Sequence, residues 1–403
     1  MADHVSWPAS WRTVPLWSLF RRIKDVGHPH EEMLSVYRDH GVIRKDSRSD
    51  NFNKTAENRD IYQLVDVGWL IVNRMKAWQG SLGVSPYRGI VSGHYLCLRP
   101  EHAEEPRFLN YLLRSAAYTV ELQRLSRGVR PNQIEIDNDG LRALPVRLPT
   151  LQEQRAIVDR LDTETVRIDA LIAKKGRLLA MVDEHLDANS EHIVWDDVAQ
   201  TIPLMHLTEA GRPIMYGIVL PGPDVPQGIS IVKGGDVAAN RLHSSRLCRT
   251  TAEIEAPYAR ARLRAADLVF AIRGGIGDVA VVPPDIEGAN ITQDVARIAP
   301  APDVDPLWLM TVLRTRSVRT QVQQRATGAT VRGLNIWDLK RIRVPWSGID
   351  RQRRDLEALL PVIERRDAVS SRLRCQIDLL REHKQALITA AVTGEMEVPG
   401  VAA

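Results

Sequence analysis

The most conspicuous candidate for chemistry is a glycine-rich stretch in the second half of the chain, Arg273-Gly-Gly-Ile-Gly-Asp278. Such a loop binds phosphate when it follows a strand and opens a helix, because the amides at the helix N-terminus then face the anion. Here the glycines lead into Asp278-Val-Ala-Val-Val282, which has the composition of a strand. We therefore predict a hairpin turn at these glycines, and another turn between strands at Gln79-Gly-Ser-Leu-Gly83.

Other outlines of catalytic sites are incomplete. A nuclease needs clustered acidic ligands for Mg²⁺ with a nearby lysine, and Asp338-Leu-Lys340 with Pro302-Asp303 upstream is the nearest pattern. We predict a helical turn there, as at its counterpart Asp139 to Ala143. Pro283-Pro284-Asp285 lacks the aromatic residue of an adenine methyltransferase loop, and His28-Pro-His30 has no further ligands at metal-site spacing. We expect no catalytic residue, metal ion or cofactor in this chain.

Basic residues give a stronger signal, because they gather in separate fields with asparagines between them. Arginine and asparagine pair with the edges of guanine and adenine, whereas lysine usually meets phosphate. The candidate DNA-binding residues are Arg44, Lys45, Arg48, Lys54, Arg59, Arg74, Arg127 and Arg130 in the first half, and Lys233, Arg241, Arg246, Arg273, Arg325 and Arg332 in the second. For any one of them a solvated surface charge is the alternative. Together they predict two DNA-facing surfaces.

Composition restricts the class of protein. A chain of 403 residues can form two or three domains, and its 44% hydrophobic and 26% charged residues are usual for a soluble protein. The net charge of +4 permits nucleic-acid binding without requiring it. Cys97, Cys248 and Cys375 match neither a disulfide framework nor a metal site. The chain shows no secretion signal and no apolar run of roughly 18 residues, so we expect a cytoplasmic protein.

The elements that must position these residues occur twice, about 200 residues apart. Strand-like segments at Trp69–Arg74, Ser81–Pro86 and His94–Pro100 have counterparts at Asp267–Ile272, Asp278–Pro283 and Asp294–Pro300. A helical segment, a basic glycine-containing stretch and a strand-like tail then follow in the same order in both halves. Six matches at a nearly constant offset indicate a duplication.

Each half closes with a long stretch of helical periodicity. Apolar residues at alternating three- and four-residue steps predict a narrow seam along which two helices pack on one another. The seam residues are Ile157, Leu161, Ile168, Leu171, Leu178 and Val182 in the first helix, and Ile363, Leu373, Ile377, Leu380 and Leu387 in the second. Two separate amphipathic surface helices are the alternative. Because proline removes an amide donor, the second helix either starts or kinks at Pro361.

These patterns predict an α/β (α+β) chain of two duplicated globular domains with two long helices. The expected boundaries are residues 1–150 for the first domain, 151–187 for the central helix, 188–347 for the second domain, 348–395 for the C-terminal helix and 396–403 for a tail.

Three stretches resemble the specificity subunits of type I restriction-modification enzymes. The sharpest is Lys384-Gln-Ala-Leu-Ile-Thr-Ala-Ala-Val-Thr-Gly394, followed by Leu148-Pro-Thr-Leu-Gln-Glu-Gln-Arg155 and by the opening Trp7-Pro-Ala-Ser-Trp-Arg-Thr-Val-Pro-Leu16. The resemblance covers nearly the whole chain. It implies two target-recognition domains, each reading half of a split double-stranded DNA site, separated by an antiparallel coiled-coil pair of long helices. It also implies two methyltransferase subunits and restriction (translocase) subunits as partners, with S-adenosylmethionine, ATP and Mg²⁺ belonging to those partners.

The chain departs from that family's pattern in two places. The first long helix runs into Asp187-Ala-Asn-Ser190 without a copy of the Gln-Ala-Leu-Ile-Thr-Ala-Ala-Val tail, and the second repeat opens less recognisably than the first. A related restriction-modification system with separate specificity subunits fits equally well. The alternatives from other classes are an adaptor that assembles proteins on its helix pair, and a nickase or fused methyltransferase.

Overall fold

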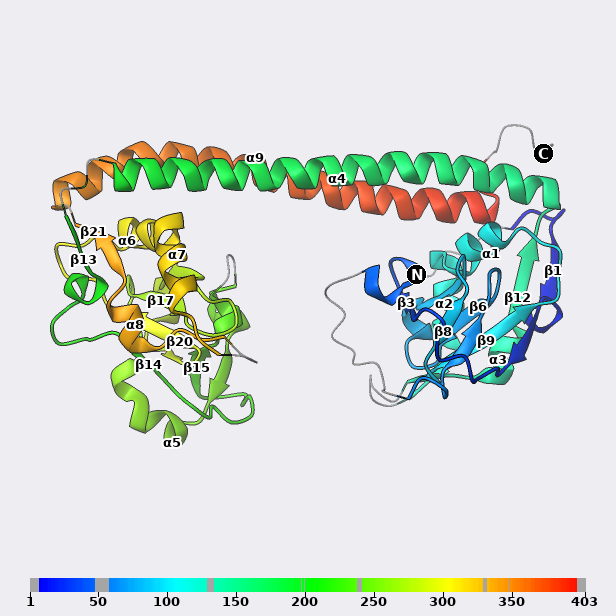
Figure 1. The fold of residues 1–403 in the computed structure, drawn as a ribbon, viewed down its shortest axis with the longest axis horizontal. Helices are drawn as coiled ribbons and strands as arrows, with labels where there is room; N and C mark the ends of the chain where they lie inside the picture. Colours follow the sequence, from blue (N-terminus) through cyan, green and yellow to red (C-terminus); the bar gives the residue numbers. More distant parts are fainter. Residues whose placement is uncertain are drawn as a thin grey trace. The chain divides into compact units, whose positions relative to one another are not determined.

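The computed structural model describes residues 7–47, 58–128, 134–196, 198, 200–237, 241–328, 332–346 and 348–396. The chain divides into two compact units (Figure 1). Unit 1 comprises residues 1–175 and 375–403, and unit 2 comprises residues 176–374. Each unit therefore contains one globular domain and segments of two different long helices. Among the described residues, no helix is both long enough and apolar enough to cross a membrane.

The domain of unit 1 is built on a four-stranded antiparallel sheet in the order β2 (Phe20–Ile23), β9 (Tyr95–Pro100), β6 (Leu70–Asn73) and β7 (Leu82–Val84). Leu70 lies opposite Leu98 on one side and Val84 on the other. Helices α1 (Pro106–Leu113), α2 (Ala116–Arg124) and α3 (Asn138–Ala143) follow the sheet in sequence. The shorter ladders pair β1 (Arg12–Pro15) with β12 (Pro145–Leu148), β3 (Leu34–Tyr37) with β4 (Gly41–Arg44), β5 (Gln63–Val65) with β8 (Gly89–Val91), and β10 (Ser126–Arg127) with β11 (Glu135–Ile136).

The domain of unit 2 repeats this plan. Its four-stranded sheet runs in the order β14 (Met215–Tyr216), β20 (Val295–Ile298), β17 (Leu268–Ala271) and β18 (Val279–Val281), and Leu268 lies opposite Ile298 and Val281. Helices α6 (Pro306–Arg314), α7 (Arg316–Arg325) and α8 (Ile336–Lys340) follow, and β13 (Thr201–Pro203) pairs with β21 (Arg343–Pro345). A further sheet joins β15 (Ile229–Val232) to β16 (Cys248–Thr250) and β19 (Asn290–Ile291), and the short helix α5 spans Ala252–Glu255. The same element order in both units confirms the predicted duplication and fold class.

The two long helices are α4 (Leu151–Trp195) and α9 (Ile349–Thr393), both 45 residues long. The central helix thus continues past the predicted end at residue 187. Asp187 to Ser190 are polar, but Ser190 and Val194 are buried, and Val194 belongs to the core of unit 2. The second helix begins at Ile349 and contains Pro361, so it does not start at the proline. Leu151 and Ile349 are 198 positions apart, which makes the helices part of the duplication.

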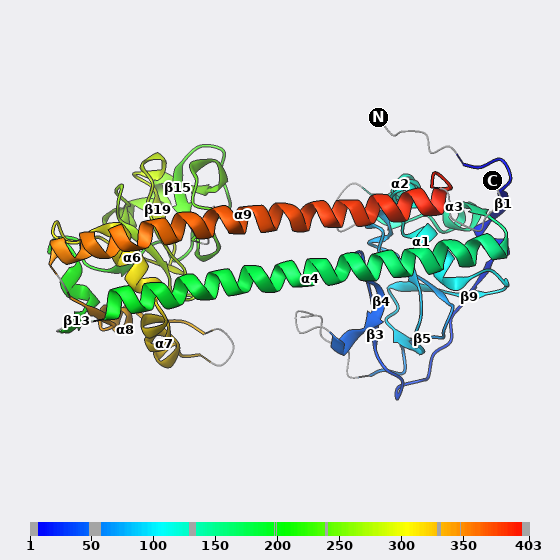
Figure 2. The same ribbon diagram turned by 90° about the horizontal axis from the view of Figure 1, so that it is seen from above.

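Within each unit the two helix segments run antiparallel, and Figures 1 and 2 show them side by side. In unit 1 the Lys175 ammonium donates to Gln376 over 2.7 Å, and Lys384 pairs with Asp169 over 2.7 Å. In unit 2 Arg366 pairs with Asp183 over 3.8 Å. Earlier residues of α4 therefore meet later residues of α9, as expected for an antiparallel pair.

The seam residues in α9 lie close to their predicted places, with Leu373 and Ile377 buried and Ile363, Leu380 and Leu387 half-buried. In α4, Ile157, Leu161 and Ile168 are buried and Val182 is half-buried. Leu171 and Leu178, however, are exposed, and Ile172 and Leu179 are half-buried in their stead. Thr165 is buried between Leu161 and Ile168, and at Leu171 and Leu178 the seam of α4 is shifted by one residue from the prediction.

The core of each domain includes the long helices. In unit 1, Phe108 and Leu112 of α1 pack with Leu161 of α4 and with Ile388 and Val392 of α9. In unit 2, Trp308 and Val312 of α6 pack with Leu359 of α9 and with Val194 of α4. Burial of apolar surface thus fixes the beginning of one long helix and the end of the other onto the same domain.

Candidate nucleic-acid interface

The domain of unit 1 carries a groove of about 850 Å³ at one end of its sheet. It lies where β6 ends and β9 begins, beside the β3–β4 hairpin. Its polar lining comprises Ser35, Lys45, Asn73, Lys76, Ser92 and His94, and its apolar lining includes Met33, Ile61 and Met75. Burial raises the pKa of Tyr95, which also lines the groove, so this side chain is a neutral phenol. We call this feature the unit 1 groove.

Several predicted basic residues border the unit 1 groove. Lys45 lines it directly, in a short turn after β4. Arg44, the last residue of β4, is exposed, pairs with Glu32 over 3.2 Å and stacks over the ring of Tyr87. Arg59 is exposed and lies two residues before the lining residue Ile61. Arg48 and Lys54 lie outside the described residues.

Two of the predicted segments meet beside the end of β6. Arg74 forms an ion pair with Glu135, and its carbonyl accepts a hydrogen bond of 3.1 Å from the Ile136 amide. Glu135 lies opposite Arg127 in the β10–β11 ladder. Arg74 and Arg127 are therefore brought together, although they are far apart in the sequence. Arg130 lies outside the described residues.

In unit 2, predicted basic residues lie at the end of β17, the counterpart of β6. Arg273 follows β17, bridges to Gly333 next to Arg332, and lies 3.8 Å from the Asp294 carboxylate. Lys233 precedes Gly234, where a Cβ atom would lie 2.8 Å from the Arg273 carbonyl oxygen, so this close approach requires glycine. The Arg241 guanidinium donates to the carbonyl of Gly235 over 3.4 Å. The backbone segments that carry Lys233, Arg241, Arg273 and Arg332 thus meet at this strand end.

Two predicted residues lie elsewhere in unit 2. The turn that contains Arg246 is held by a hydrogen bond of 3.1 Å from the Ser244 amide to Asp285. Arg325 is half-buried at the end of α7 and donates to the carbonyl of Gln321 over 3.2 Å.

The ends of β6 in unit 1 and β17 in unit 2 share a hydrogen-bond pattern. The Arg74 amide donates to the carbonyl of His94 over 3.1 Å, and the Ile272 amide donates to that of Asp294 over 2.8 Å. Lys76 and His94 were missed because the prediction followed the density of charge along the chain. Their signal is position: Lys76 follows one central strand and His94 precedes its neighbour, so antiparallel pairing places them at the same sheet edge.

The glycine-rich stretch is a turn, as predicted. It joins β17 to β18, and Gly274 and Gly277 have φ angles of +74° and +98°, a backbone conformation that favours glycine. Asp338 and Lys340 lie in helix α8, also as predicted. His28 contacts Asp25 over 2.9 Å, and within the described ranges no three His, Cys, Asp or Glu residues are grouped as a metal site would need.

Comparison with known proteins agrees with this architecture. Residues 22–176 match the type I restriction modification DNA specificity domain. The chain is 25% identical over 275 residues to the type I restriction enzyme EcoBI specificity subunit of Escherichia coli; the match covers 62% of this chain and 58% of that subunit's length. The chain thus spans less than two thirds of this curated relative.

Among solved structures, one described as the structural basis of complex assembly and conformational transition of the type I R-M system has a TM-score of 0.65 at 17% identity, covering 97% of this chain and all of that one. The HsdS subunit from Thermoanaerobacter tengcongensis gives a TM-score of 0.43 at 17% identity, covering 98% and 99% of the two chains. The first of these likenesses shows a shared fold. The matched specificity domain and the E. coli relative make the chain similar to the specificity subunits of type I restriction-modification enzymes over the matched residues.

Proposed function

We propose that the chain is the sequence-reading subunit of a type I restriction-modification system, and that each of its two domains reads one half of a gapped double-stranded DNA site. The observation that carries this proposal is the repeated placement of cations at the same sheet edge: Lys45, Lys76 and Arg74 in unit 1, and Lys233, Arg273 and Arg332 in unit 2. Cations supply most of the affinity for a DNA backbone, and the polar side chains among them supply base recognition.

The chain directs chemistry that its partners perform. Two methyltransferase subunits and the restriction subunits bind it, and S-adenosylmethionine, ATP and Mg²⁺ act in those subunits. The purified chain alone therefore neither methylates nor cleaves DNA when all three are supplied. Turnover by a preparation free of partner subunits would overturn this part of the proposal.

Domain exchange tests the two-reader arrangement. The methylated motif is first determined by methylation-sensitive sequencing of DNA from cells with and without the gene. Residues 1–150 are then replaced by the matching domain of another specificity subunit. We expect one half of the methylated motif to change and the other half to stay the same. If both halves change together, the domains do not read DNA independently.

Salt dependence tests the unit 1 groove itself. Replacing Lys76 or Lys45 by Gln removes one cation from the lining, and each change should flatten the plot of log affinity against log salt concentration by about one unit. Lys174→Gln is the matched control, because Lys174 is an exposed lysine of α4 outside the groove. A slope unchanged by the groove variants, or changed equally by the control, would exclude the groove from DNA contact.

An adaptor that assembles proteins on its helix pair is the competing function. It predicts no preference among DNA sequences and no dependence of binding on salt. Leu171 and Leu178 on α4 are exposed and offer an apolar surface for protein contact. They support an adaptor role only in addition to DNA binding, because an adaptor does not account for the basic residues at the sheet edges.

A further inference from the structure

One glutamine in each long helix makes the same contact to the adjoining domain. Gln154 lies in the first turn of α4 and Gln352 in the first turn of α9, 198 positions apart, and both side chains are completely buried. The Gln154 side-chain oxygen accepts a hydrogen bond of 3.0 Å from the Glu105 amide. The Gln352 oxygen accepts one of 2.8 Å from the Asp305 amide. Glu105 and Asp305 are the N-cap residues of α1 and α6.

The side-chain nitrogen of each glutamine also donates hydrogen bonds to residues at the start of a helix. The nitrogen of Gln352 donates to the carbonyl of Asp303 over 3.1 Å, two residues from the bond at Asp305. The nitrogen of Gln154 donates to the Glu104 carboxylate over 2.6 Å and to the carbonyl of Pro149 over 3.0 Å. Each glutamine therefore binds the start of a domain helix through both its side-chain oxygen and its side-chain nitrogen. Because the amide group is planar, the directions of these hydrogen bonds are fixed.

The sequence explains why the long helix must supply this acceptor. In a capping box, a Glu or Gln at the third helical position accepts from the amide of the N-cap residue. That position is Phe108 in α1 and Trp308 in α6, and neither side chain can accept. Gln154 and Gln352 take over this role from a different helix. Without them a buried amide would lose its partner, which proteins seldom tolerate.

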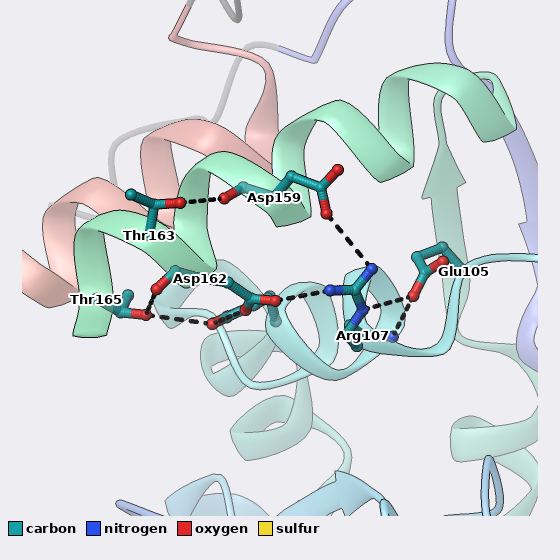
Figure 3. Close-up of polar contacts among 7 residues, drawn as sticks. Glu105, Arg107, Asp159, Asp162, Thr163 and Thr165 are labelled. Atoms are coloured by element: carbon teal, nitrogen blue, oxygen red, sulfur yellow. Dashed lines mark hydrogen bonds and ion pairs between the residues drawn. The ribbon is translucent and has the colours of Figure 1, made fainter. Parts of the chain in front are cut away.

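The remaining contacts at the two junctions differ between the units. In unit 1, Arg107 of α1 reaches Asp162 of α4 over 2.8 Å and Asp159 over 3.5 Å, and it also pairs with Glu105 (Figure 3). In unit 2, the indole of Trp308 donates to Asp355 over 3.0 Å. Further polar contacts also involve different pairs: Tyr111 of α1 donates to Asp162 over 2.8 Å in unit 1, and the indole of Trp195 donates to Thr315 over 3.0 Å in unit 2. The glutamine bonds are thus the shared directional element of both junctions.

We propose that Gln154 and Gln352 are positioning residues that fix the angle at which each domain meets its long helix, and that they thereby determine how strictly the gap between the two half-sites is read. This inference rests on the proposed function, since it assumes that each domain reads one half-site. The two residues touch no DNA, so the choice of bases does not depend on them.

The test compares Gln154→Met and Gln352→Met with the unchanged full-length chain. Methionine fills a similar volume and removes every hydrogen bond of the side-chain amide. Affinity is measured for duplexes that carry both half-sites at the preferred gap, and at gaps one base pair longer or shorter. We expect the preference for the correct gap to fall about fivefold in each variant, the fold-change that corresponds to one net hydrogen bond. Base preference within each half-site should stay the same.

Gln376→Met is the matched control, because Gln376 is a glutamine of α9 whose contact is with Lys175 of α4 and not with a domain helix. A loss of affinity by the same factor at every gap, or an unchanged gap preference, would overturn the inference. Should Gln154→Met fail to fold, Gln154→Asn, whose amide is too short to reach both partners, and Gln352→Met give the same test. If the unchanged chain shows no gap preference, it is the proposed function that fails.

Discussion

The same position of the main sheet holds different residues in the two units. In unit 1, Cys97 of β9 lies between Ile71 and Ile23 of the neighbouring strands. In unit 2, Arg297 of β20 lies between Val269 and Met215. Both side chains are almost completely buried. The Arg297 guanidinium donates to the carbonyls of Arg260 and Pro213 over 2.5 and 3.1 Å. One sheet position thus holds a thiol or a guanidinium, depending on whether the surrounding loops offer acceptors.

The protonation behaviour of the two groups reflects the same burial. Burial raises the pKa of the Cys97 thiol to about 12, so it stays protonated and unreactive. Burial also lowers the pKa of Arg297, and the nearby Arg212 adds to this effect. The two domains therefore share apolar residues at equivalent sheet positions, such as Leu70 and Leu268. A buried polar residue differs between the domains, and the groups that bond to it differ with it.

Exchanging the thiol of unit 1 for the guanidinium of unit 2 should have the largest effect. Cys97→Arg buries a charge where neighbouring strands present apolar side chains, and we expect it to destabilise unit 1 by at least about 4 kcal/mol. Chemical denaturation combined with limited proteolysis would show early loss of unit 1 while unit 2 stays folded. Cys97→Val, which keeps the site apolar, is the control. A variant as stable as this control would mean that unit 1 also supplies acceptors.

The domain–helix junctions provide a second contrast. Asp355 is 4% exposed and accepts from Trp308 and from Arg351, so Asp355→Ala leaves the buried indole N–H without its acceptor and removes one acceptor of the Arg351 guanidinium. We expect a loss of about 3 kcal/mol in unit 2. Asp162 in unit 1 bonds Tyr111 and Arg107 but is 39% exposed, so Asp162→Ala should cost about 1 kcal/mol. Equal shifts of the two unfolding transitions would contradict this difference.

Elements with strong local patterns could be predicted from the sequence alone. The apolar segments Leu70–Val72 and Leu268–Phe270 are strands, and the offset between the halves located each counterpart. The end of α4 was missed because Asp187 to Ser190 look like a polar break, and only the domain that covers Val194 makes the last turns apolar on one side. The shift in the seam has a similar cause: apolar residues are adjacent at Leu171–Ile172 and Leu178–Leu179, and the phase between them is decided by the partner helix.

The candidate site was harder to predict than the fold. Charge density identified Lys45 and Arg74, but Lys76 and His94 become neighbours of Lys45 only when strand ends meet. Arg74 and Arg127 likewise meet through Glu135, which no count of basic residues includes. The candidate DNA-contacting residues are brought together by tertiary pairing of strands, and a single sequence contains little trace of that pairing.

The shifted seam leads to a third prediction, with a smaller effect. Ile172→Glu places a carboxylate between α4 and α9 in unit 1, and we expect a loss of about 2 kcal/mol. Leu171→Glu changes the neighbouring, exposed position and should alter stability by less than about 0.5 kcal/mol. Thermal unfolding of both variants would measure the difference. If Leu171→Glu were the more damaging change, the seam would follow the register first expected from the sequence.

The smallest expected effect concerns pH and again separates the two units. His102 follows β9 and packs against Phe20, and the residue in the same place after β20 is Pro302. The Glu104 amide donates to the Nδ1 atom of His102 over 3.0 Å, so that nitrogen carries no proton. Burial lowers the pKa of His102, and the Glu104 carboxylate opposes this shift only in part.

Because the unfolded chain takes up a proton near pH 6.5 and the folded domain does so only at lower pH, the unfolded state binds more protons between these values. The stability of unit 1 that depends on neutral His102 is therefore complete above that pH and is lost as the pH falls below it, with a slope of at most about 1.4 kcal/mol per pH unit. His102→Asn keeps an acceptor for the Glu104 amide but cannot titrate. Denaturation at about pH 7.5 and about pH 5.5 should show a larger loss in the unchanged protein than in the variant, confined to the unit 1 transition. An equal loss in both proteins would assign the pH dependence to other groups.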